Sequence, residues 1–169
     1  MAAKFLNIVA GRLQQIAALV VSTGAGDADK LIATGADGRI DSSVLPVGIG
    51  ADTKVIAASE TLSAGNYVSV WNDSGTQKVR KADATAAGKE ATGFVLAGAA
   101  SGANATVFFE GTNTQLSGLT PGARYYLDTT AGAVVDTPPT GSGNVVQFIG
   151  TAVSATEISF EPDAGIILA

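Results

Sequence analysis

The spacing of the apolar positions divides the chain into two unlike parts. Near the start, apolar residues recur at intervals of three and four, which is the spacing of one helix face. These residues are Leu6, Val9, Leu13, Ile16 and Val20. The pattern predicts one amphipathic helix over residues 4–21, ended by the glycines at positions 24 and 26. Such a helix gains most of its stability from packing, either on its own β domain, in a helical bundle or on a neighbouring protein.

From Lys54 onward, short apolar runs alternate with clusters of Gly, Ala, Thr and Asn. In residues 106–110, Val107 and Phe109 would share one strand face, opposite Phe108. We expect strands at 54–58, 66–71, 77–81, 91–97, 105–110, 124–127, 133–136, 145–153, 157–160 and 166–168. Their recurrence at roughly eight to twelve residues is typical of an all-β sandwich or barrel. The predicted fold is mainly β: an antiparallel β-sandwich or barrel with an N-terminal amphipathic helix and an extended arm.

A polar connector, residues 22–53, joins the two parts. It holds two short apolar pieces, 31–34 and 39–40, on either side of a Gly-Ala-Asp-Gly sequence that favours a tight turn. A hairpin of this size is not stable alone, so the connector needs a neighbour to dock on. The predicted domains are therefore 1–53, helix and connector arm, and 54–169, the β domain.

Charge narrows the set of partners. The 169 residues carry a net charge of −5, and the only basic residue after Glu90 is Arg124. This balance disfavours non-specific nucleic-acid binding, which needs Lys and Arg to neutralise phosphates. No apolar run approaches the roughly 20 residues of a membrane-spanning helix. We therefore expect neither a nucleic acid nor a membrane as partner.

Candidate chemistry is sparse, because the chain contains no Cys and no His. This excludes thiol nucleophiles, imidazole bases and Cys/His metal sites. A hydrolase would therefore have to use carboxylates as its catalytic groups, and Glu110, Glu157 and Glu161 fall on or beside expected strands. The simpler interpretation is that these glutamates point outward and keep a β protein in solution. We expect no catalytic residues, no metal site and no cofactor.

Three aromatic residues leave a carbohydrate-binding module open as an alternative. Trp71, Tyr125 and Tyr126 could form a platform on which a sugar stacks. They lie within expected strands, where packing in a core or a subunit interface is the default.

The connector resembles a segment that recurs in structural proteins of tailed bacteriophages. The segment is AGDADKLIATGADGRIDSSVLP, residues 25–46, and in those proteins it often follows a short N-terminal helix and precedes a β domain. Four further pieces are similar to small virion proteins of such phages: VRKADAT (79–85), GFVLA (93–97), LTPGARYYL (119–127) and ISFEPD (158–163). Together these pieces extend the resemblance over most of the chain.

The resemblance implies a non-enzymatic capsid decoration (cement) protein. Such a protein would sit on the outer surface of the virion head as a homotrimer, bind the major capsid protein and stabilise the lattice. The expected contact residues on the helix are Leu6, Val9, Leu13, Ile16 and Val20; those on the arm are Leu31, Ile32, Ile40, Val44 and Leu45. The alternatives are a tail, baseplate or short-fibre component, or the carbohydrate-binding module.

Overall fold

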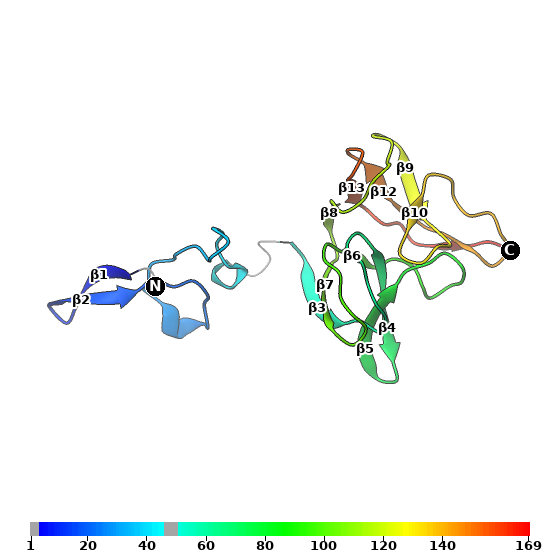
Figure 1. The fold of residues 1–169 in the computed structure, drawn as a ribbon. Helices are drawn as coiled ribbons and strands as arrows, with labels where there is room; N and C mark the ends of the chain where they lie inside the picture. Colours follow the sequence, from blue (N-terminus) through cyan, green and yellow to red (C-terminus); the bar gives the residue numbers. More distant parts are fainter. Residues whose placement is uncertain (1–3, 46–50) are drawn as a thin grey trace. The chain divides into compact units, whose positions relative to one another are not determined.

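The computed structural model describes residues 4–45 and 51–169 and divides the chain into two compact units, Met1–Gly50 and Ala51–Ala169 (Figure 1). Both units are built from antiparallel strands. The helical segments of the described residues are two single 3-10 turns, η1 (Ala25–Asp27) and η2 (Ser42–Val44). The mainly β, antiparallel prediction is therefore confirmed.

The N-terminal helix prediction is wrong. Residues 4–17 form a hairpin, in which β1 (Lys4–Val9) pairs with β2 (Arg12–Ala17). Ala10 and Gly11 make the two-residue turn, with φ of 51° and 76°. Two consecutive positive φ values are what a type I′ hairpin turn requires.

The physical reason lies in where the chain reverses. A glycine in a helix interior costs roughly 0.5–1 kcal/mol relative to alanine, whereas in this turn Gly11 adopts a backbone conformation that suits it. The β-branched residues Ile8, Val9 and Ile16 also favour strands. Once the chain reverses at residues 10–11, the spacing of three and four no longer describes one face. Leu6 pairs with Gln15, and Ile8 pairs with Leu13.

The rest of the first unit folds back on Leu19, which follows the hairpin. The Leu19 amide donates to the Leu31 carbonyl at 2.8 Å, and the Ala33 amide donates to the Leu19 carbonyl at 2.7 Å. The expected tight turn is present, because the Gly35 amide donates to the Arg39 carbonyl at 2.8 Å. Residues 31–33 thus pair with Leu19, and not with residues 39–40 as the sequence suggested.

The second unit begins with a five-stranded sheet in the order β3-β7-β6-β4-β5. Its strands are β3 (Thr53–Ala57), β4 (Tyr67–Asp73), β5 (Thr76–Lys81), β6 (Gly93–Val95) and β7 (Asn104–Phe108). The sheet curls until Ala58, just after β3, forms a parallel bridge with Val79 of β5. Its concave face holds a cluster of small apolar side chains that includes Ile56, Val68 and Val107.

A second five-stranded sheet has the order β10-β9-β12-β13-β8. Its strands are β8 (Gly111–Asn113), β9 (Arg124–Leu127), β10 (Val134–Val135), β12 (Phe148–Ala152) and β13 (Ile158–Phe160). The two-residue strands β11 (Val145–Val146) and β14 (Ile166–Ile167) pair separately. No sheet of the described residues closes into a barrel.

One glycine fixes the close approach of β12 and β13. The register between β12 and β9 shifts between Phe148 and Gly150. A Cβ atom on Gly150 would lie only 1.9 Å from the Ser159 carbonyl oxygen of β13. Real Cβ atoms essentially never come so close, so the pairing at this point depends on the absence of a side chain.

The two sheets share one aromatic core. Phe94 of the first sheet lies 5.5 Å, ring centre to ring centre, from Phe160 of the second sheet and from Phe108 of its own. Tyr67 completes the group at 5.7 Å from Phe160, and Leu127 and Ile149 pack around it. Because Phe108 enters this core while Val107 enters the other cluster, both faces of β7 are covered by apolar residues.

Tyr67 brings a polar atom into that core. Its side chain is fully buried, and its phenol oxygen has no hydrogen-bond partner among the described residues. Burial raises the pKa of Tyr67 well above its ordinary value, an effect that the nearby Asn113 side chain opposes only in part. The hydroxyl therefore stays protonated, and because it is buried without a partner it opposes the stability of the core.

The expected strand segments correspond to the observed strands with two departures. β8 has no counterpart among them. The expected strand 145–153 is interrupted at Gln147, which separates β11 from β12. The side-chain amide of the buried Gln147 accepts from the Ala91 backbone amide at 2.8 Å and donates to the Ala91 carbonyl at 3.0 Å. The side chain thereby completes the hydrogen bonds of a buried loop backbone.

Candidate functional site: the exposed apolar residues of the N-terminal unit

The first unit carries its apolar residues on its surface. Among the described residues, none before Ile56 is buried. Of the ten expected contact residues, eight are exposed: Leu6, Val9, Leu13, Val20, Leu31, Ile32, Ile40 and Leu45. Ile16 and Val44 are half-buried. Soluble proteins rarely leave many large apolar side chains in water on so short a segment, which makes this unit the strongest candidate for an interaction surface.

The hairpin register sorts the predicted helix stripe onto two faces. Leu6, Ile8 and Leu13 share one face and are 65%, 69% and 67% exposed. We name these three residues the hairpin face. Val9 and Ile16 lie on the opposite side, and Val20 lies beyond the hairpin. The structure thus brings Leu6 and Leu13 together and separates them from the rest of the stripe.

The helix interpretation missed Ile8 as a member of this face. In a helix Ile8 would only widen the edge of the stripe, so it was not among the expected contact residues. In the strand it follows Leu6 on the same side and pairs across the hairpin with Leu13. One feature of the sequence could have indicated this face: Leu6, Asn7 and Ile8 alternate between apolar and polar, which is the period of a strand.

The connector forms a shallow groove of about 360 Å³, which we name the connector groove. Its apolar lining comes from Leu19, Ile32, Val44 and Leu45. Its polar lining comes from Ser22, Asp27, Lys30 and Ser43. Three of the five expected arm residues, Ile32, Val44 and Leu45, therefore meet in this groove. Leu31 and Ile40 do not line it and lie exposed elsewhere on the unit.

A fixed ion pair lies at the groove. Lys30 Nζ is 2.6 Å from Asp27 Oδ1, and Thr23 donates to Asp27 Oδ2 from its amide at 2.6 Å and its hydroxyl at 3.0 Å. The hydrogen bond from Lys30, followed by those from Thr23, lowers the pKa of Asp27 to about 2. Asp27 therefore stays ionised at physiological pH and holds η1 in place.

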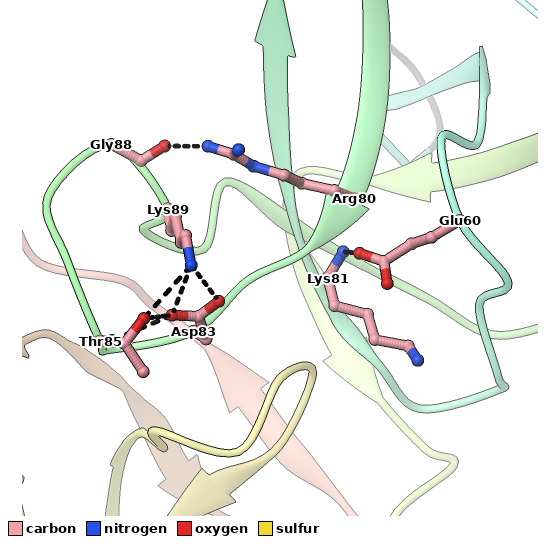
Figure 2. A network of polar contacts seen from close by, with 7 residues as sticks. All are labelled: Glu60, Arg80, Lys81, Asp83, Thr85, Gly88 and Lys89. Atoms are coloured by element: carbon pink, nitrogen blue, oxygen red, sulfur yellow. Dashed lines mark hydrogen bonds and ion pairs between the residues drawn. The ribbon is translucent and has the colours of Figure 1, made fainter.

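In the second unit, the loop between β5 and β6 carries the densest polar network (Figure 2). Lys89 Nζ lies 3.1 Å from Asp83 Oδ2, and Thr85 donates to Asp83 Oδ1 from its amide and its hydroxyl. Burial raises the pKa of Asp83, but the bonds from Thr85 and Lys89 outweigh it and hold that pKa below its ordinary value. Arg80 closes the same loop with a bond of 2.6 Å to the Gly88 carbonyl.

This loop connects β5 and β6 of the first sheet and also bonds to backbone groups from later in the unit. The Ala84 amide donates to the Asp128 carbonyl at 2.9 Å, and the Val145 amide donates to the Ala84 carbonyl at 2.8 Å. The network thus fixes a segment whose backbone bonds to Asp128, just after β9, and to Val145 of β11. Among the described residues, no group of three or more acidic residues could hold a metal ion.

The three aromatic residues considered for sugar stacking do not form one platform. Trp71 lies on β4, where the Arg80 guanidinium covers its ring at 4.8 Å. Tyr125, on β9 of the other sheet, is buried, and its hydroxyl accepts from the Thr120 amide at 3.0 Å. Tyr126 faces the opposite side of β9 and packs edge-on against Phe148.

The three glutamates are likewise divided along β13. Glu157 precedes this strand and Glu161 follows it, and each accepts a hydrogen bond from a neighbouring serine. Glu110 is exposed just before β8 and lies near the Glu161 end of the ladder, because Gly111 pairs with Phe160. The three carboxylates therefore do not meet at one place.

No known family model matches this chain, and no curated protein is significantly similar to it. Among the residues that the structure describes, no helix is both long and apolar enough to span a membrane. The candidate site therefore depends on the exposed apolar residues of the first unit and on the charges around them.

Proposed function

We propose that this chain is a non-enzymatic structural protein of a tailed-phage virion. In this proposal it decorates the outer surface of the head as a homotrimer, binds the major capsid protein and stabilises the lattice. The observation that carries the proposal is the contrast between its two units. The second unit buries its own core, while the first leaves Leu31, Ile40 and the hairpin face in water.

Physical arguments support a division of labour between the units. The β unit packs two sheets in the manner of a sandwich and needs no partner to complete its core, so it serves as the exposed knob. The first unit supplies several separate apolar contacts. Weak contacts of this kind add up when three copies are tethered in one particle, which suits attachment to a repeating lattice.

The decisive experiment measures binding of the purified chain to undecorated heads. Leu31→Ser together with Ile40→Ser should weaken binding, because these side chains are exposed and do not line the connector groove. Val153→Ser, at an equally exposed apolar position of the β unit, serves as the matched control and should bind normally. Equal binding by all three proteins would contradict the proposal.

Copy number in purified virions distinguishes the head from the tail. A number comparable to that of the major capsid protein, measured by quantitative mass spectrometry, is expected for a decoration protein. A few copies per virion would instead place the chain among the tail, baseplate or short-fibre components. Absence from virions would refute both.

A further inference from the structure

The hairpin face has no cover within its own unit. Figure 1 shows the hairpin extending away from the connector turns of the same unit, and Leu6, Ile8 and Leu13 are each about two-thirds exposed. A two-stranded hairpin is at best marginally stable in water without a surface to pack on. A partner that covers this face would therefore stabilise the hairpin as well as bury apolar area.

Charge indicates what that partner is. The hairpin carries Lys4 and Arg12 and no acidic residue, so its charge is +2. The connector up to Gly50 carries four aspartates against Lys30 and Arg39, so its charge is −2. Among the described residues, neither hairpin cation lies in an ion pair. The two halves of the first unit are thus complementary, and the unit as a whole is neutral and does not repel a copy of itself.

The connector groove supplies the matching apolar surface. It holds about 360 Å³ of open space lined by Leu19, Ile32, Val44 and Leu45. Asp27, paired with Lys30, lies in its lining, and the connector that forms it carries the excess of negative charge. A leucine or isoleucine side chain from the hairpin face could enter this space while Lys4, which shares that face, approaches the connector aspartates; Arg12 lies on the opposite face beside the turn and adds to the positive charge of the hairpin.

We propose that the hairpin face of one copy packs into the connector groove of a second copy of this chain. Because the two contacting surfaces differ, each copy offers one of each, and the contact can repeat from copy to copy until it closes a ring. This contact would supply the trimer interface of the proposed function. It is tested without capsids, so its failure leaves the capsid-binding test above unaffected.

The first test changes the apolar contact and measures self-association of the full chain by sedimentation equilibrium. Leu6→Ser and Leu13→Ser are each expected to raise the dissociation constant about tenfold or more, because each removes a large apolar side chain from the interface. Ile166→Ser and Val153→Ser, at exposed positions of the β unit, should leave it unchanged. A wild-type chain that stays monomeric, or an assembly lost only with Ile166→Ser, would overturn the proposal.

The second test exchanges charges. Lys4→Glu with Arg12→Glu makes the hairpin acidic, and Ala28→Lys, Asp29→Asn and Ala36→Lys make the connector basic while keeping the aspartates that cap its turns. Asparagine suits position 29 because Asp29 has a φ of 63°. Each set alone should prevent assembly, because like charges then face each other.

Combining both sets in one chain should restore assembly. A mixture of the two singly altered chains should also associate, but it should not form the closed trimer, because each chain then binds only the other kind and an alternating ring needs an even number of chains. Assembly should weaken with salt, as expected for exposed charges. If the mixture or the combined chain stays monomeric, the hairpin is covered by something other than a second connector.

Discussion

Removing residues 1–50 is expected to leave the unfolding thermodynamics of the β unit almost unchanged. Every buried residue among those described lies at or after Ile56, so the first unit adds no core that melts on heating. The heat-capacity change of unfolding compares the full chain with the fragment most directly, because it reports the apolar surface exposed when each unfolds.

The expected magnitude follows from chain length. Unfolding raises the heat capacity by about 12–15 cal/mol/K per residue in ordinary globular domains, which gives about 1.4–1.8 kcal/mol/K for the unit Ala51–Ala169. A full chain packed throughout to the same degree would reach about 2.0–2.5 kcal/mol/K. Since the first unit has no buried residue among those described, we expect the full chain to stay near the lower range.

The assay is differential scanning calorimetry on the fragment 51–169 and on the full chain. The full chain carries Leu6→Ser and Leu13→Ser, so that association between copies contributes no heat. Both proteins should melt in one transition at nearly the same temperature. A heat-capacity change in the full chain that exceeds that of the fragment by more than about 0.5 kcal/mol/K would refute the reasoning, since about 50 residues would then bury a core of ordinary size.

Three further changes test the β unit, each by urea denaturation. Tyr67→Phe should leave the free energy of unfolding unchanged or raise it by up to about 1–3 kcal/mol, because it removes a buried hydroxyl without a partner. Tyr125→Phe removes a bonded hydroxyl and should cost about 1 kcal/mol; equal losses would show that the Tyr67 hydroxyl is bonded. Asp83→Asn should lower stability by about 1–3 kcal/mol at neutral pH. Because the pKa of Asp83 is lower in the folded state, its contribution to stability is complete above the unfolded pKa of about 3.9 and disappears as the pH falls through the folded value. The free energies of unfolding of the wild-type chain and Asp83→Asn should therefore converge in acid. A difference that does not depend on pH would contradict this. Gly150→Ala should cost more than about 3 kcal/mol of stability, because the new Cβ meets the neighbouring strand. Gly122→Ala should cost about 1 kcal/mol, because Gly122 has a positive φ but open space around it. Similar costs for the two changes would mean that β12 and β13 separate easily.

Local patterns alone were enough to predict most of the β unit. Alternation in short runs such as residues 105–110, together with frequent turn residues, indicates strands without knowledge of their partners. Gln147 shows the limit of this reasoning. Its neighbours have strand character, and no local pattern indicates that the strand is interrupted at Gln147, whose side chain bonds to the distant Ala91 backbone.

The candidate site was predicted as a set of residues and not as a geometry. That Leu6, Leu13, Leu31 and Ile40 are apolar residues in a segment too small to bury them is evident from the sequence, and the structure leaves them exposed. Their grouping was not evident, because a spacing of three and four over 18 residues fits a helix, and a hairpin with a turn at residues 10–11 can carry the same residues. The choice between the helix and the hairpin depends on whether the backbone bonds along one segment or across the turn at residues 10–11.

Residue types and their local order are enough to predict the antiparallel β character, the division into a first part without a core and a second part with one, and the absence of thiol and imidazole chemistry. The three-dimensional structure was needed to establish that Trp71 and Tyr125 lie on different sheets, and that Leu6, Ile8 and Leu13 form one face. The reason is that register and sheet order join residues far apart in the chain, and these long-range pairings leave no periodic trace in the sequence.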